Sequence, residues 1–211
     1  MGIEDKRREY DYGKLTRDLL SDDPFKQFQL WMDQALQADI QDPTAMSVAT
    51  VDSYGQPWSR MVLLKGFDSN GYVFYTNLGS RKAAEIQANN KVCLHFPWLQ
   101  MDRQVIISGY AQPLSKDEVQ QYFTRRPRES QLAAWASEQS HPIDSREQLE
   151  QKFAHIQQRF LDKEVSLPDF WGGYRVVPNK MEFWQGGESR LHDRFVYSLD
   201  KDNWLISRLA P

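Results

Sequence analysis

Five short segments rich in β-branched and aromatic residues constrain the fold of this chain more than any other feature of its sequence. They fall within about 70 consecutive residues and read TAMSVATV, WSRMVLLKGF, GYVFYTN, KVCLHFPWL and RQVIISGYAQPL. Turn signals such as DSYGQP and DSNG separate several of them, and turns this short join antiparallel neighbours. The pattern therefore predicts an antiparallel barrel or sandwich.

Helical segments surround these strands. Residues 24–39 carry apolar side chains at helical spacing after the candidate caps Asp22 and Asp23, and residues 80–90 read as a second helix. Two further helices open with capping boxes, in the segments SKDE and SREQ. The segments 170–178, 180–187, 194–199 and 203–211 return to strand patterns. We expect a polar N-terminal arm over residues 1–22 and one α+β domain over residues 23–211.

Composition narrows the function classes. The chain has 211 residues, of which 40% are hydrophobic, so it is long and apolar enough for a sizeable core. A net charge of −3 argues against nucleic acid or an anionic membrane as the partner. The single Cys93 and the four histidines show no zinc-site spacing, so we expect no metal. Without a long apolar run or an apolar signal core, a cytoplasmic location is expected.

Three basic clusters indicate anion sites. In NLGSRKAAEI, Ser80 is a candidate N-cap that places Arg81 and Lys82 in the first helical turn, where cations are unfavourable unless an anion sits on them. In SRMVLLKGF, Arg60 and Lys65 would point to opposite faces of a strand unless a bulge intervenes. The two cations could then hold two different anions, or one of them could be solvated. Each cluster has a plainer interpretation as solvated surface charge.

The third cluster is YFTRRPRES, in which Tyr122, Arg126 and Ser130 are spaced by four. On a continuous helix these three side chains would share a face and grip a phosphate. Pro127 should, however, end or kink the helix near Arg126. The alternative is a basic helix end that interacts with its own carbonyl groups.

The stretch WQGGESRLHDR predicts a site for a flat, polar ring. In an extended chain Arg190, His192 and Arg194 would share one face, next to the aromatic plane of Trp184; the alternative is a charged hairpin edge. Together with the anion sites, this face fits a nucleotide-like cofactor and a phosphorylated aromatic substrate. A Rossmann fold is not expected because no GxGxxG follows a strand, and no P-loop is present.

The segments RMVLLKGF, VFYTNLGSRKA, RPRESQLAAWASEQS, FWGGYRV, EFWQGGESRLHDR and the terminal RLAP keep the order and spacing of a known family. From about Arg7 to Pro211 the chain resembles the pyridoxine/pyridoxamine 5′-phosphate oxidases. The resemblance implies an FMN-binding split β-barrel with surrounding helices. It also implies a homodimer that holds FMN at the subunit interface.

The resemblance also assigns roles to residues. Those implied for FMN are Arg60, Met61, Val62, Leu63, Leu64, Lys65, Tyr75, Thr76, Arg81, Lys82, Gln104, Gln139, Ser140, Trp184 and Arg194. Those implied for the substrate are Lys65, Tyr122, Arg126 and Ser130 on its phosphate, Arg190, Leu191 and His192 near its ring, and Arg7, Arg8, Glu9 and Tyr10 on a closing arm. The implied catalytic residues are Arg190, His192 and Asp42, although Asp42 also fits a plain turn before Pro43.

The implied reaction yields pyridoxal 5′-phosphate, the active form of vitamin B6. Hydride passes from C4′ of pyridoxine 5′-phosphate or pyridoxamine 5′-phosphate to FMN, oxygen is reduced to hydrogen peroxide, and the amine substrate also releases ammonia. Two alternatives stay open. One is another split-barrel flavin oxidoreductase, which would not need the Tyr122–Arg126–Ser130 grip. The other is a non-catalytic carrier of FMN or pyridoxal phosphate, which would not need Arg190 and His192.

Overall fold

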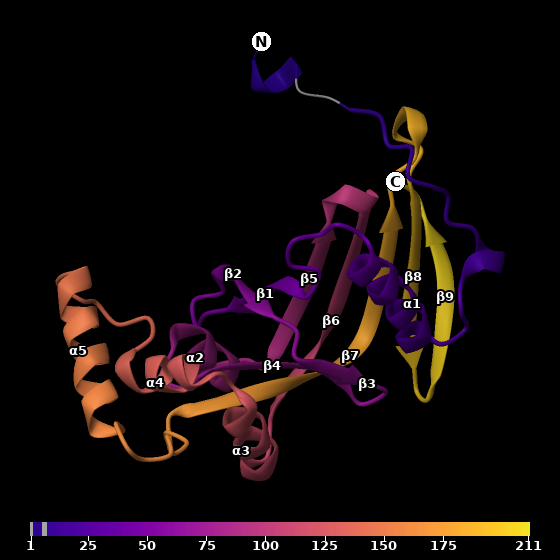
Figure 1. The fold of residues 1–211 in the computed structure, drawn as a ribbon. Helices are drawn as coiled ribbons and strands as arrows, with labels where there is room; N and C mark the ends of the chain where they lie inside the picture. Colours follow the sequence, from indigo (N-terminus) through magenta and orange to yellow (C-terminus); the bar gives the residue numbers. More distant parts are fainter. Residues whose placement is uncertain (1, 6–7) are drawn as a thin grey trace.

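A single antiparallel sheet organises the molecule (Figure 1). The computed structural model describes residues 2–5 and 8–211. In that part of the chain the sheet has nine strands. They are β1 (Ala45–Val51), β2 (Pro57–Leu63), β3 (Gly66–Asp68), β4 (Gly71–Asn77), β5 (Lys91–Trp98), β6 (Arg103–Pro113), β7 (Trp171–Gln185), β8 (Asp193–Asp200) and β9 (Asn203–Leu209).

The main path through the sheet runs β2-β1-β5-β6-β7-β4-β3, and β8 and β9 extend it from β7. Within the described residues the two end strands of this path, β2 and β3, do not pair with each other. The sheet is therefore a split barrel and not a closed one. This confirms the expected antiparallel α+β fold.

The predicted strand over residues 58–67 is broken where the chain changes partner. The Leu64 amide donates to Thr44 O at 2.9 Å, whereas the next amide, that of Lys65, donates to Val73 O at 2.8 Å. The backbone thus leaves β1 and joins β4 within two residues. This step links β2 and β3, the two end strands of the path through the sheet.

Strand β7 is the longest element, with 15 residues, and it joins two segments that the sequence pattern separates. It pairs with β6 along most of its length, with β4 at its start and with β8 at its end. The register with β6 shifts between Ser108 and Gly109. A Cβ atom on Gly109 would lie 2.1 Å from Val177 O, so a glycine is needed where the two strands approach.

The helices are α1 (Pro24–Gln37), α2 (Arg81–Ala88), α3 (Lys116–Arg125), α4 (Arg128–Ala136) and α5 (Arg146–Arg159), with short 3₁₀ turns η1 (Ile3–Asp5), η2 (Arg17–Leu19), η3 (Leu99–Met101) and η4 (Glu188–Arg190). Figure 1 shows α2 to α5 gathered toward the end of the sheet where β7 begins, and α1 close to β8. Asp23 caps α1 by accepting from the Phe25 amide at 2.8 Å. The capping box of Ser115 and Glu118 forms as predicted.

Two hydrophobic clusters hold these elements together. The larger one packs α1 on the sheet, with Trp31 against Phe183 at 5.3 Å between ring centres. The smaller one packs α3, α4 and α5 on the first residue of β7, Trp171. Among residues 2–5 and 8–211, no helix has the length and apolar character that crossing a membrane requires.

The later part of the expected N-terminal arm is anchored in the core. Leu15 and Leu20 are buried in the larger cluster. The Leu15 amide donates to Asp193 Oδ2 at 3.0 Å, and the Tyr197 hydroxyl donates to Ser21 O at 2.7 Å. The packing therefore leaves residues 8–14 as the part of the described arm that lies over the surface.

Candidate active site

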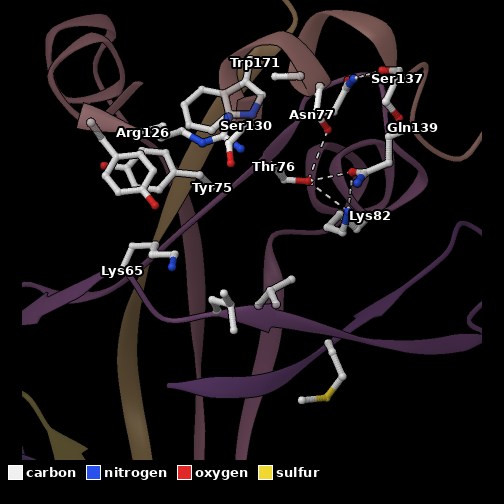
Figure 2. A pocket seen from close by; sticks show the side chains of 16 residues that line it. Lys65, Tyr75, Thr76, Asn77, Lys82, Arg126, Ser130, Ser137, Gln139 and Trp171 are labelled. Carbon is white, nitrogen blue, oxygen red and sulfur yellow. Dashed lines mark hydrogen bonds between the residues drawn. The ribbon is translucent and has the colours of Figure 1, made fainter. Parts of the chain in front are cut away.

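A cavity of about 360 Å³ lies where β2, β4 and the start of β7 meet α2, α3 and α4 (Figure 2). It brings together eleven of the side chains expected at the cofactor or the substrate phosphate, which come from distant parts of the sequence. They are Met61, Val62, Leu63, Lys65, Tyr75, Thr76, Lys82, Tyr122, Arg126, Ser130 and Gln139. An adjoining hollow of about 410 Å³ shares Met61, Lys82 and Gln139 with it and is also lined by Arg60, Arg81 and Ser140.

Lys82 is a buried cation with neutral partners. Its side chain is 7% exposed, and its Nζ donates to Thr76 Oγ1 at 2.9 Å and to Gln139 Oε1 at 2.8 Å. Figure 2 shows this group of three at one end of the cavity. Burial, with the nearby Arg60 adding to the effect, lowers the pKa of the Lys82 ammonium to about 8. The charge of Lys82 is thus poorly compensated and suits a bound anion.

Arg60 and Arg81 converge on one buried carboxylate, Glu85, which is 5% exposed. Arg60 Nη2 lies 3.0 Å from Glu85 Oε2 and Arg81 Nε lies 2.8 Å from Glu85 Oε1. Burial opposes the charge on Glu85, but hydrogen bonds from Thr50 and both arginines outweigh it and lower the pKa of the carboxyl. Arg81 also stacks over the Trp58 ring, 3.1 Å from its centre. This network fixes both guanidinium groups beside Lys82, at the N-terminus of α2.

Tyr122, Arg126 and Ser130 line the cavity together although the helix is broken between them. As the proline predicts, α3 ends at Arg125, and Pro127 precedes α4. Arg126 Nη1 is buried and has no hydrogen-bond partner in the described part of the chain. Burial also lowers the pKa of Arg126. An unpaired buried donor of this kind is a place where an anion would be stabilised.

Trp184, Gln104 and Arg194 lie on neighbouring strands at the other end of the sheet. Gln104 pairs with Trp184, and Trp184 pairs with Arg194. Arg194 donates to both carboxylate oxygens of Glu182, at 3.0 and 3.2 Å, and to Ala210 O at 2.9 Å. None of the three lines the cavity that holds Lys82 and Arg126.

The prediction that Arg190, His192 and Arg194 share one face of an extended chain is wrong at Arg190. Residues Glu188–Arg190 form the turn η4, and Ser189 and Arg190 have left-handed φ angles of 53° and 65°. The turn is closed by the Gly187 amide, which donates to His192 Nδ1 at 3.1 Å. The local fold is a tight loop before β8, because the Leu191 amide donates to Glu188 O at 3.0 Å in place of a strand partner.

The N-terminal arm packs on this loop. The Tyr10 ring meets Trp184 and His192 edge-on, at 5.8 and 5.3 Å between ring centres. Glu9 Oε2 accepts from the Ser189 amide at 3.2 Å, and Arg8 pairs with the buried Asp102. Glu9 and Tyr10 therefore lie next to the loop with Arg190 and His192, and Arg8 lies beside them on Asp102; Arg7 lies outside the described residues.

Two expected site residues lie elsewhere in this chain. Leu64 is 5% exposed and packs in the main core, so its side chain does not line the cavity. Asp42 is exposed in the turn before β1, where its carbonyl accepts from the Ala45 amide at 2.9 Å. Asp42 is not among the residues that line the cavity with Lys82 and Arg126.

Several side chains at the site were not singled out from the sequence. Asn77, Ser137 and Trp171 line the cavity, and Glu85 holds the two arginines. Only Glu85 has a local signal, since it follows Arg81 by one helical turn. The others depend on the pairing of β4 with β7 and on the placement of α4, which no local pattern encodes.

Apart from Leu64 and Asp42, the expected site residues that the structure describes thus form two groups at opposite ends of β7. Trp171 at the start of the strand lines the cavity, whereas Trp184 lies 13 residues further on. At about 3.3 Å per residue the two are separated by roughly 40 Å along the strand. The two groups of one chain therefore lie far apart along β7.

The split antiparallel sheet, with a cavity lined by Lys82 and Arg126 beside a helix N-terminus, defines the class of FMN-binding split-barrel flavoproteins. PhzG from Burkholderia lata 383, solved with tetrahydrophenazine-1-carboxylic acid, superposes with a TM-score of 0.87 at 30% identity over 92% of this chain and 95% of that one. An FMN-binding protein from Nostoc punctiforme superposes with a TM-score of 0.73 at 15% identity over 91% and 100%, which supports the fold.

Within this class the chain belongs to the pyridoxamine 5′-phosphate oxidase family. The model of that family matches residues 32–160, and the model of the pyridoxine 5′-phosphate oxidase C-terminal dimerisation region matches residues 171–211. The pyridoxine/pyridoxamine 5′-phosphate oxidases of Pseudoalteromonas translucida and Vibrio cholerae are 58% and 56% identical to it, over 100% of each chain.

Proposed function

We propose that this chain is an FMN-dependent oxidase that converts pyridoxine 5′-phosphate and pyridoxamine 5′-phosphate into pyridoxal 5′-phosphate, with oxygen as the electron acceptor. The observation that carries the proposal is the cavity lined by two separate anion-binding groups, one around Lys82 and one around Arg126. A cofactor phosphate and a substrate phosphate need two such groups. Family membership and the full-length relatives support the same reaction.

The residues around Lys82 fit the phosphate of FMN. Lys82 supplies a buried cation with neutral partners, and Arg60 and Arg81 are fixed beside it by Glu85. The N-terminus of α2 adds backbone amides and the positive end of a helix dipole. Met61, Val62 and Leu63 provide an apolar wall for a ring system, and FMN supplies the acceptor for the hydride that leaves C4′ of the substrate.

The residues around Arg126 fit the substrate phosphate. Arg126 offers an unpaired donor, and Lys65, Tyr122 and Ser130 line the same part of the cavity. Gripping the phosphate fixes the position of the pyridine ring and thus of the reacting carbon. Arg190 and His192 would cover the ring, and the Arg190 guanidinium would stabilise negative charge that develops on the substrate oxygen or ring. We retain Asp42 as a candidate catalytic carboxylate.

We propose further that each active site is shared by two chains. The cavity of one subunit would be completed by Gln104, Trp184, Arg194 and the loop with Arg190 and His192 of the partner subunit. Two observations support this arrangement. The two groups lie at opposite ends of β7, and the matched dimerisation region spans residues 171–211, which include most of the second group. Glu9 and Tyr10 pack on that loop and, together with Arg8, would close the shared site.

Two other functions remain as alternatives to test. A different flavin oxidoreductase of this fold would keep the Lys82 group without needing the Arg126 group. A carrier of FMN or pyridoxal phosphate would bind ligand without turnover. The presence of both groups, the one around Lys82 and the one around Arg126, favours the oxidase over either alternative.

We also propose a cytoplasmic location, because the single free Cys93 suits a reducing compartment and both proposed ligands are phosphorylated.

The test is turnover by the purified protein loaded with FMN. Oxygen consumption and formation of pyridoxal 5′-phosphate are measured with each substrate, for the wild type and for Arg190→Ala. The wild type should oxidise at least one of the two substrates. Arg190→Ala should keep its flavin with an unchanged spectrum and lose at least about thirtyfold in kcat/KM, or about 2 kcal/mol of transition-state stabilisation. A flavin-loaded wild type that turns over neither substrate would favour the carrier or another oxidoreductase.

A further inference from the structure

Trp171, the first residue of β7, has no role in the proposed chemistry, yet it lines the cavity (Figure 2). Trp171 is 8% exposed, and its indole faces the Arg126 guanidinium at 4.7 Å from the ring centre. The Phe123 ring is further from the same guanidinium, at 5.8 Å. Trp171 is therefore the principal aromatic contact of Arg126.

An aromatic contact holds the Arg126 side chain and does not neutralise its positive charge. In the described part of the chain Arg126 forms no ion pair, and its buried Nη1 has no hydrogen-bond partner. A carboxylate in the place of Trp171 would neutralise the guanidinium, whereas an indole face attracts it and leaves its N–H groups free. The geometry thus keeps a desolvated cation in place and available to a phosphate.

Gly173, two residues after Trp171, leaves room for a second aromatic side chain, that of Tyr75. Gly173 pairs with Tyr75 across β4 and β7, and a Cβ atom on Gly173 would lie 2.8 Å from Tyr75 Cδ1 and 2.7 Å from Phe74 O. The Tyr75 ring is nearly parallel to Trp171 at 5.3 Å and stacks on Tyr122 at 3.9 Å. Trp171 and Tyr75 thereby contact two of the residues expected to bind the substrate phosphate: Trp171 contacts Arg126, and Tyr75 contacts Tyr122.

We propose that Trp171 is a positioning residue that sets the affinity for the substrate phosphate by holding the Arg126 guanidinium. Tyr75, with the space that Gly173 leaves for it, supports Tyr122 in the same way. The inference rests on the proposed function for the identity of the substrate. Its physical content, that Trp171 acts on phosphate binding through Arg126, is independent of the reaction.

The first experiment replaces Trp171 with side chains that attract a cation less strongly than an indole does, and it measures the effect on KM. In FMN-loaded enzyme, Trp171→Phe should raise KM for pyridoxine 5′-phosphate by about threefold to tenfold, and Trp171→Leu by more, because phenylalanine attracts a cation less and leucine does not. The values of kcat and the FMN dissociation constant should change by less than about twofold. If Trp171→Leu does not fold, Trp171→Phe alone decides the outcome.

Phe170→Leu is the matched control. Phe170 is the preceding residue and also packs edge-on against an aromatic ring, that of Trp135, at 5.8 Å between ring centres, but it does not line the cavity. The control should leave KM unchanged. An equal rise in KM for Phe170→Leu and Trp171→Leu would indicate a general packing effect and overturn the proposal.

A double-mutant cycle separates positioning from a structural role. Trp171→Phe is measured in the wild-type and in the Arg126→Ala background, and its effect on KM should fall to less than about twofold when Arg126 is absent. The same factor in both backgrounds would overturn the proposal, as would a change in KM that is accompanied by equal losses in kcat and FMN affinity. Calorimetric titration of the FMN-loaded variants with inorganic phosphate provides a second readout. If the wild type oxidises neither substrate, the proposed function fails, and this titration still decides the role of Trp171.

Discussion

At the scale of single residues, Lys82 carries the clearest prediction about the cofactor. It is a buried ammonium held by Thr76 and Gln139, neither of which is charged. Lys82→Ala removes a charge-assisted hydrogen bond that contributes ~1.5–3 kcal/mol, so FMN affinity should fall by about tenfold to a hundredfold. Fluorescence titration with FMN measures the loss.

The exposed Lys91, on β5, serves as the control, and Lys91→Ala should leave FMN affinity unchanged. Once saturated with FMN, the Lys82→Ala enzyme should turn over nearly as fast as the wild type. An undiminished affinity in Lys82→Ala would show that the phosphate binds elsewhere.

The lowered pKa of Lys82 predicts how FMN binding depends on pH. In the protein without an anion the pKa is about 8, so Lys82 is charged below that pH and increasingly neutral above it. A bound phosphate raises the pKa again, so above pH 8 binding must take up a proton. FMN affinity should therefore be constant just below pH 8 and fall as the pH rises above it, by up to about tenfold per pH unit.

Lys82→Arg tests the assignment of this pH dependence, because a guanidinium stays protonated throughout the range. Titrations between pH 7 and 10 should show a falling affinity for the wild type and a much flatter profile for Lys82→Arg. The same decline in both proteins would mean that a different group titrates.

At the scale of elements, α3 delivers Tyr122 to the cavity and depends on its N-terminal cap. Ser115 accepts from the Glu118 amide, and Glu118 Oε2 accepts from the Ser115 amide at 3.0 Å. Ser115→Ala should lower the free energy of unfolding by ~1 kcal/mol, whereas Ser115→Asn, which can still cap, should lower it by less. Urea unfolding at fixed protein concentration measures both. Equal losses in the two variants would contradict the capping role.

Elements with local signals could be predicted from the sequence. The caps at Asp23 and Ser115 and the helix end before Pro127 all form as expected. Features that depend on distant pairing could not. The break at Leu64 arises because the backbone changes partner from β1 to β4, and the long β7 forms because three strands pair with it. The loop at Arg190 was predicted as extended, because hydrogen bonds such as that of the Gly187 amide to His192 are not visible in a spacing pattern.

The candidate site shows the same division. The basic clusters around Lys82 and Arg126 could be found because each is local in the sequence. Their meeting in one cavity required the fold. Trp171 was missed because its role depends on α3 ending beside the start of β7. The resemblance to a family supplied Gln104, Gln139 and Ser140, which carry no local signal of their own.

At the scale of the whole molecule, the central claim is that one active site is built from two chains. The cavity with Arg126 and the loop with Arg190 lie at opposite ends of β7 in the same chain. In a dimer with two-fold symmetry, each cavity would therefore receive the loop of the partner subunit. A variant in the cavity and a variant in the loop should then complement each other.

The measurement is kcat/KM of a purified heterodimer that combines one Arg126→Ala chain with one Arg190→Ala chain, isolated through two different affinity tags. Both parent homodimers should be strongly impaired at low substrate concentration. The heterodimer has one site with both defects and one intact site, so we predict about half of the wild-type kcat/KM per dimer. A heterodimer that is as impaired as its two parents would contradict the account, because it would place both residues of each site on the same chain.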